Sequence, residues 1–149
     1  MFLIILQFLI TISCRKYSVD DLLTAPEDLL INNREYILES CLWRDFQPIC
    51  PPDGQPLIGV IIVIATDSLQ FPSSLDADHV WVINGNDVWD TELINRYSPY
   101  GQEYKIVKRT KDSGPKWGPG IYVDVVVQLI DDDSTYLLRA SNQYIIRTD

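Results

Sequence analysis

The stretch from Asp76 to Leu93, DADHVWVINGNDVWDTEL, constrains the fold of this chain more than any other feature. Two short segments rich in β-branched and aromatic residues flank the sequence NGND at positions 84–87. Asparagine and glycine tolerate the positive φ angles that a tight hairpin turn requires. We therefore predict a β-hairpin here, with one tryptophan on each strand available to begin a core.

Other segments also have the pattern of strands. In residues 121–130, IYVDVVVQLI, apolar side chains occupy alternate positions, which is typical of a strand with one buried face. Residues 57–66, LIGVIIVIAT, are apolar almost throughout, which predicts a strand covered on both faces. Asn32-Asn33 and the acidic run 131–134 are turn signals. Periodicity of the helical kind is nearly absent.

These segments predict an all-β fold, an antiparallel immunoglobulin-like β-sandwich of about seven to eight strands. The chain has 149 residues, of which 46% are hydrophobic, so it is long enough for one domain with a substantial core. We place that domain at residues 29–149. A signal peptide at 1–13 and a polar tether at 14–28 precede it.

The first thirteen residues, MFLIILQFLITIS, form an apolar run that is too short to cross a bilayer as a helix, which takes about 20 residues. The run has the length of the apolar core of a secretory signal. It ends at Ser13-Cys14, and a small residue followed by cysteine at this place resembles the cleavage box of bacterial lipoproteins. That resemblance implies that Cys14 becomes the first residue and is acylated, so that a lipid bilayer holds the chain. The alternative is an ordinary secretory signal with an incidental cysteine.

The remainder of the chain carries several distinctive phrases. They are LWRDF, PPDGQPLI, DADHVWVINGNDVW, GPKWGPGIYVDVVVQLID and TYLLRASNQ. In these phrases the chain resembles small exported bacterial proteins with an uncharacterised immunoglobulin-like domain. The resemblance implies a stand-alone domain in the cell envelope and no particular activity.

Two of the three cysteines lie close together in sequence. Cys41 and Cys50 bracket the proline-rich bend QPICPPDGQP. In an oxidising compartment a bond between them would close a loop of about ten residues and stabilise the fold by roughly 2–3 kcal/mol. We predict this disulfide, the alternative being two small cysteines that never pair.

Composition excludes several classes of function. The formal charge of −9 argues against binding to nucleic acid, which requires clustered lysine and arginine. His79 is the single histidine, and no nucleophile elbow, zinc-binding histidine pair or phosphate loop is present. We therefore expect no catalytic residues, no metal and no cofactor, and we expect that the protein is not an enzyme.

Aromatic residues in the loops are the candidates for binding. Trp117 lies in the Gly/Pro-rich loop KDSGPKWGPG, and Tyr97, Tyr100 and Lys116 would share its rim if the loops cluster at one end of the domain. An exposed tryptophan is a stacking platform for a sugar or an anchor for a protein. The alternative is that Trp117 folds back and caps the core. The sequence thus predicts a lipid-anchored binding or scaffolding module of the bacterial cell envelope, periplasmic or surface-exposed, with a protein partner. The alternative is a carbohydrate-binding module that uses Trp117 and the tyrosines.

Overall fold

The computed structural model describes residues 17–96 and 101–149. The predicted signal peptide, Cys14, Tyr97 and Tyr100 lie outside the described residues. Within these described residues, one short helix precedes eight strands. Their bounds are α1 Val19–Leu23, β1 Asp28–Ile31, β2 Arg34–Asp45, β3 Ile58–Ala65, β4 Leu75–Asn84, β5 Asp87–Asn95, β6 Lys105–Thr110, β7 Tyr122–Asp131 and β8 Ser134–Thr148.

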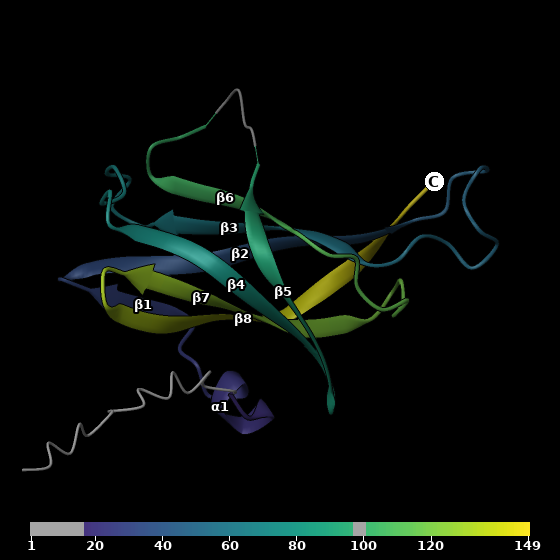
Figure 1. Cartoon of the computed structure of the whole chain (residues 1–149), viewed down its shortest axis with the longest axis horizontal. Coiled ribbons are helices and arrows are strands. Elements are labelled where there is room, and N and C mark those ends of the chain that lie inside the picture. Colours follow the sequence, from purple (N-terminus) through teal and green to yellow (C-terminus); the bar gives the residue numbers. More distant parts are fainter. Residues whose placement is uncertain (1–16, 97–100) are drawn as a thin grey trace, which may run out of the picture.

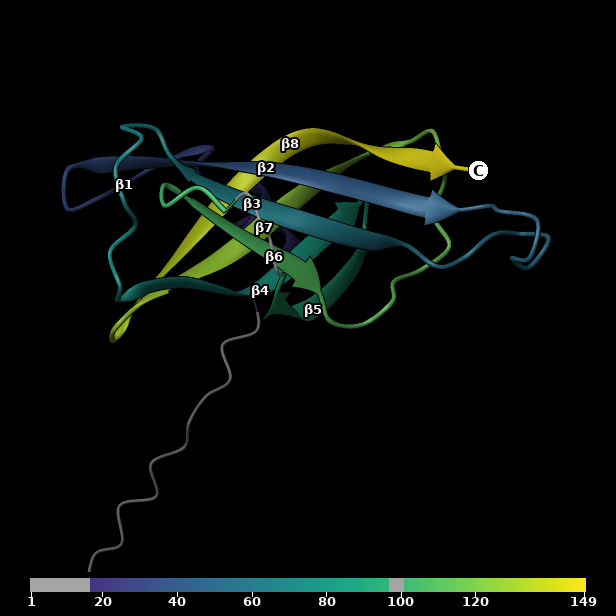
Figure 2. The ribbon, with the colours of Figure 1, turned by 90° about the horizontal axis from the view of Figure 1, so that it is seen from above.

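Seven of the strands form a closed β-barrel. Neighbouring strands follow the order β2-β3-β6-β5-β4-β7-β8, and a parallel pairing of β8 with β2 completes the circle. That pairing joins Leu42–Asp45 to Ile145–Thr148, and every other pairing is antiparallel. β1 is an additional strand, paired with the first residues of β2. Figures 1 and 2 show the strands wrapped around a single interior.

The prediction of an antiparallel immunoglobulin-like sandwich is therefore wrong, although the all-β class is right. Alternating side chains and closely spaced turns are common to sandwiches and barrels, so the local pattern does not separate them. What separates them here is the pairing of β2 with β8, a contact between residues about one hundred positions apart. The barrel also explains why β3 is not fully covered on both faces, contrary to the prediction from its apolar sequence. Ile61 and Val63 are buried, while Ile58, Ile62 and Ile64 face outward and are only half-buried.

The predicted hairpin of β4 and β5 and the predicted turn at Asn32-Asn33 are both confirmed. Asn84 pairs with Asp87 around Gly85, whose φ of +61° is one that glycine adopts without strain. Ile31 pairs with Arg34, and the two asparagines between them have φ angles of 51° and 63°. Asparagine is the side chain that best tolerates this left-handed region. Local turn chemistry therefore sets both registers, as the sequence indicates.

The barrel interior is filled by alternate residues of the strands. The predicted buried face of β7 is confirmed, since Val123, Val125, Val127 and Leu129 are all at most 3% exposed. The tryptophans of the β4–β5 hairpin, however, do not form one core. Trp89 packs against the interior cluster, while Trp81 lies outside the barrel under α1.

Helix α1 covers part of the outer wall. Leu22 is 1% exposed and packs with Ile83 and Val126, which point outward from β4 and β7. Ser18 caps the helix, and the main-chain nitrogen of Asp21 donates to its side-chain oxygen at 3.1 Å. The segment before the strands is thus packed against the barrel from Tyr17 onward.

The predicted disulfide between Cys41 and Cys50 is wrong, because both cysteines are free. Cys41 is exposed on the outer face of β2, and the strand continues for four more residues before it ends at Asp45. Four extended residues carry the chain about 13 Å. Cys50 lies in the turn beyond, whereas a disulfide needs Cα atoms within roughly 7 Å.

Arg44 closes one end of the barrel. It lies on the inward face of β2 and is 3% exposed. Among the described residues its acceptors are four main-chain carbonyl oxygens, two in the β2–β3 loop and two in the β6–β7 loop, namely those of Asp53, Gln55, Lys116 and Gly118. The guanidinium also lies over the Phe46 ring, 5.0 Å from its centroid. One buried cation therefore ties together two loops that have little regular structure.

We predict that Arg44→Met lowers the free energy of unfolding by about 3–5 kcal/mol, because four carbonyl oxygens of two loops lose at once a donor that is itself buried. Urea unfolding followed by tryptophan fluorescence measures this loss. Arg109→Met on the exposed face of β6 is the matched control and should leave the midpoint unchanged. Equal midpoints for the two variants would contradict the role given to Arg44.

Candidate functional site: a gap in the barrel wall

The wall of the barrel opens between β4 and β6. β5 pairs with β4 only from His79 onward and with β6 only at residues 108–110. Within residues 17–96 and 101–149, the first residues of β4 (75–78) and of β6 (105–107) consequently have no strand partner toward β5. The two strand ends face each other across a groove of about 470 Å³. This size is within the range of ligand sites in proteins.

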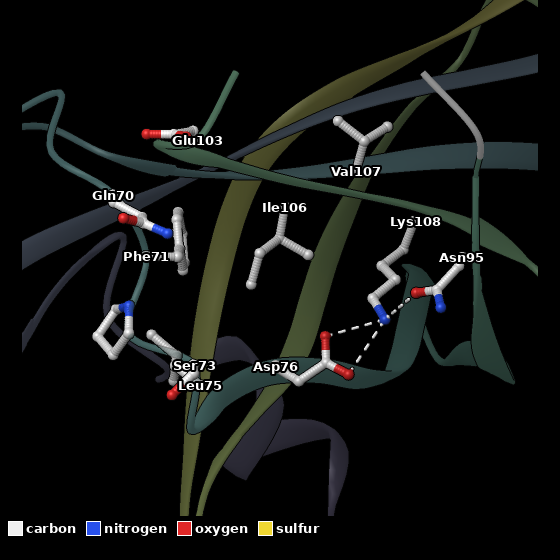
Figure 3. A pocket seen from close by; sticks show the side chains of 11 residues that line it. Gln70, Phe71, Ser73, Leu75, Asp76, Asn95, Glu103, Ile106, Val107 and Lys108 are labelled. Carbon is white, nitrogen blue, oxygen red and sulfur yellow. Dashed lines mark hydrogen bonds and ion pairs between the residues drawn. The ribbon is translucent and has the colours of Figure 1, made fainter. Parts of the chain in front are cut away.

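The groove has an apolar floor and a polar wall (Figure 3). Phe71, Leu75 and Ile106 supply the apolar side chains, and Phe71 also contacts the ring of Tyr36, with centroids 5.3 Å apart. Asp76, Asn95 and Lys108 supply the polar ones. Gln70, Ser73 and Glu103 add polar groups to the lining.

Lys108 spans the gap where backbone pairing is missing. Its Nζ lies 2.9 Å from Asp76 Oδ1 on β4 and donates to Asn95 Oδ1 on β5 at 2.6 Å. Its side chain is only 8% exposed, while that of Asp76 is 52% exposed. A buried ammonium is stable only when it is paired and hydrogen-bonded, and this one is. The ion pair replaces a missing part of the strand ladder, so it fixes the width of the groove.

One lip of the groove is held by a second ion pair. Arg34 Nε donates to Asp67 Oδ2 at 2.8 Å, and the same guanidinium donates to the carbonyl oxygens of Leu69 and Gln70. The hydrogen bond from Arg34, followed by that from the Leu69 N–H, lowers the pKa of Asp67 from 3.8 to about 2. The loop that carries Gln70 and Phe71 is therefore clamped to the start of β2.

The predicted binding residues of the β6–β7 loop lie elsewhere. Trp117 is half-buried and packs against the interior cluster. Lys116 pairs with Asp53 at 2.8 Å, a hydrogen bond that lowers the pKa of Asp53, and so it links two loops at the Arg44 end. The structure does not bring either residue to the groove. Tyr97 and Tyr100 belong to the undescribed segment.

An exposed aromatic pair is found instead on β7 and β8. Tyr122 and Tyr144 are partners in the strand register and are 65% and 48% exposed. Their ring centroids are 5.1 Å apart. Asp124 lies on the same outer face beside them, and its Oδ1 accepts from the main-chain nitrogen of Asn142 at 3.2 Å.

His79 contacts two side chains of its own hairpin, β4–β5. Its Nε2 lies 3.5 Å from Asp90 Oδ1, and its ring packs on Trp81 with centroids 4.7 Å apart. Among the described residues, no group of three or more His, Cys, Asp or Glu side chains is arranged to hold a metal ion. In the same part of the chain, no helix has the length and apolar character needed to cross a membrane.

Protein-family models, curated proteins and solved structures give no match to this chain. The likeness to bacterial lipoproteins and to small exported proteins therefore stays a prediction from the residues themselves. What the chain does has to be argued from the geometry of the groove and of the exposed surfaces.

Sequence reasoning missed the groove, although one signal of it was present. Ile106, Lys108 and Thr110 share the inward face of β6, and Tyr104 just before the strand also packs on the core. A lysine therefore stands in a row of otherwise core-facing side chains. A lysine in such a row needs an anionic partner. The partners Asp76 and Asn95 come from other strands, and their proximity depends on the barrel.

We predict that Asp76→Asn destabilises the fold by about 2 kcal/mol, because it leaves the enclosed ammonium of Lys108 without a counter-charge. Lys108→Met should cost less than about 1 kcal/mol, since Asp76 and Asn95 are exposed and water can solvate them. Urea unfolding of both variants gives the comparison. A larger loss for Lys108→Met would show that the lysine stem, rather than the ion pair, stabilises this wall.

A second prediction concerns pH. Because the pKa of Asp67 is depressed in the folded state, its stabilising contribution is fully present above pH 3.8 and is lost as pH falls through about 2. The Leu69 N–H donates to Asp67 Oδ1 at 2.9 Å, so its ¹⁵N–¹H resonance should titrate with a midpoint near pH 2. Asp67→Asn should abolish that titration. A midpoint near 3.8 would mean that Arg34 does not hold the loop in solution.

Proposed function

We propose that this chain is a lipid-anchored binding module of the bacterial cell envelope, without catalytic activity, and that the groove between β4 and β6 is its binding site. The observation that carries the proposal is the gap in the barrel wall, where residues 105–107 of β6 have an apolar groove beside them in place of a strand. The anchor is acylated Cys14.

The ligand that suits this groove is an extended peptide segment of an envelope protein. A peptide strand that lies along a free strand edge gains main-chain hydrogen bonds, and pockets for alternate side chains provide specificity. Here alternate side chains of the peptide would meet Phe71, Leu75 and Ile106. Lys108 is neutralised by Asp76, so Glu103 leaves the groove with a net negative charge. A peptide with apolar residues and one basic residue complements it.

A carbohydrate-binding module is the second candidate, and the exposed pair Tyr122–Tyr144 favours it. Aromatic faces stack on sugar rings, and the Asp124 carboxylate beside them can accept from hydroxyl groups. Trp117, which the sequence suggested for this role, is packed against the core. The two candidates therefore use different walls of the barrel, and one experiment separates them.

The test places a photo-cross-linking amino acid in turn at Glu103, at Tyr122 and at Asp133, and irradiates intact envelopes. Glu103 is in the groove, Tyr122 is in the tyrosine pair, and Asp133 in the β7–β8 turn is the control. We expect a discrete protein adduct from position 103 alone. Adducts to cell-wall glycan from position 122 would favour the second candidate, and equal labelling at 103 and 133 would reject the groove.

Intact mass of the membrane-extracted protein tests the anchor in the same samples. The expected mass is that of a chain that starts at Cys14 and carries acyl groups. Cys14→Ala should release the protein from the membrane and remove the added mass. An unacylated wild-type chain would contradict the lipid anchor while leaving the groove open to test.

A further inference from the structure

The chain packs against the barrel from Tyr17 onward, three positions after Cys14, the proposed site of acylation. The ring of Tyr17 meets that of Trp81 edge-on, with centroids 5.3 Å apart. Beyond it, Leu22 and Ala25 are buried against the outer wall. Arg139 then holds the end of the segment, since its Nε donates to the Ala25 carbonyl oxygen at 3.0 Å and its main-chain nitrogen to that of Pro26 at 2.8 Å.

Little chain is therefore left to act as a tether. Only Arg15 and Lys16 separate Cys14 from Tyr17. At most about 3.6 Å is gained per residue, so the three steps from Cys14 to Tyr17 span no more than roughly 11 Å. The polar headgroup layer of one leaflet is itself about 5–8 Å thick. An acyl chain on Cys14 lies in the hydrocarbon, so Tyr17 has to stay at the level of the headgroups or just above it.

We propose that the wall of the barrel covered by α1 rests on the headgroup layer of the membrane that holds the anchor. This inference rests on the proposed acylation of Cys14. The contact surface comprises the half-buried Tyr17 just before α1, together with Asp20 and the other exposed parts of the helix. In Figure 1, α1 lies below the barrel while β3 and β6 lie at its top, so the β6 rim of the groove is turned away from the lipid.

The negative charge of the domain does not favour contact with an anionic membrane. The short tether is therefore what holds α1 at the membrane surface. The whole chain has a formal charge of −9, and Asp20 and Asp21 lie in the first turn of α1. Like charges repel at an anionic surface within about a Debye length, roughly 8–10 Å at physiological ionic strength. A barrel on a long flexible linker would leave such a surface, whereas one held within roughly 11 Å cannot. Orientation on the membrane is thus imposed by chain length.

The test uses acylated protein purified from membranes and reconstituted in vesicles of phosphatidylethanolamine and phosphatidylglycerol with a nitroxide-headgroup lipid. A fluorophore is attached at Asp20→Cys on α1 or at Arg109→Cys on β6, both in a Cys41→Ser, Cys50→Ser background. Both native positions are exposed. We expect at least about threefold stronger quenching at position 20. Insertion of twelve Gly/Ser residues between Lys16 and Tyr17 should reduce that quenching to the level of position 109, because the linker then reaches tens of ångströms.

Each outcome decides a separate point. Equal quenching at the two positions in protein whose mass shows acyl groups would overturn the orientation and leave the proposed anchor standing. Strong quenching that survives the insertion would show that α1 binds lipid by itself, which would overturn the role of the short tether. Protein without acyl groups would overturn the proposed anchor and the orientation together.

Discussion

The buried guanidinium of Arg44 is the interaction on which one end of the barrel depends. Proline and glycine make the loops after β2 and β6 poor in regular hydrogen bonds, so their carbonyl oxygens need donors from elsewhere. Arg44 satisfies four of them from a single inward position on β2. Next to it, the Phe46 N–H donates to the Thr148 carbonyl oxygen at 2.7 Å and so extends the pairing of β2 with β8. The end of β2 therefore both holds the two loops in a fixed conformation and closes the barrel.

Between the first residues of β4 and of β6 the barrel wall is incomplete. A side-chain ion pair stands there in place of backbone hydrogen bonds. β5 leaves β4 after Glu92, the partner of His79, and meets β6 over three residue pairs only. Lys108 bridges the resulting gap through Asp76 and Asn95. Arg44 donates to neutral carbonyl groups, whereas Lys108 is paired with a carboxylate, so the two buried cations have different roles. Arg44 holds two loops together at one end of the barrel, and Lys108 keeps the groove between β4 and β6 at a fixed width.

The sequence predicted those parts of the fold that depend on near neighbours. Asn-Asn and Asn-Gly specify their turns through the backbone angles that these residues tolerate, and the alternate valines of β7 identify its buried face. Contacts between distant segments were not predictable in this way. Trp81 lies on the outer face of β4, where α1 covers it, and Lys108 meets Asp76 only once the strands have closed. For the same reason the local pattern was mistaken for that of a sandwich.

The parallel pairing of β2 with β8 has a consequence for the order of events during folding. Leu42–Asp45 must wait for Ile145–Thr148, about one hundred positions later in the chain, before the barrel can close. Hairpins such as β4–β5 can form as soon as their own residues are free, since their contacts are local. The barrel therefore stays open until residues 145–148 have reached residues 42–45, although its hairpins have already formed. Closure is the late step of folding because the contact that makes it spans about one hundred positions.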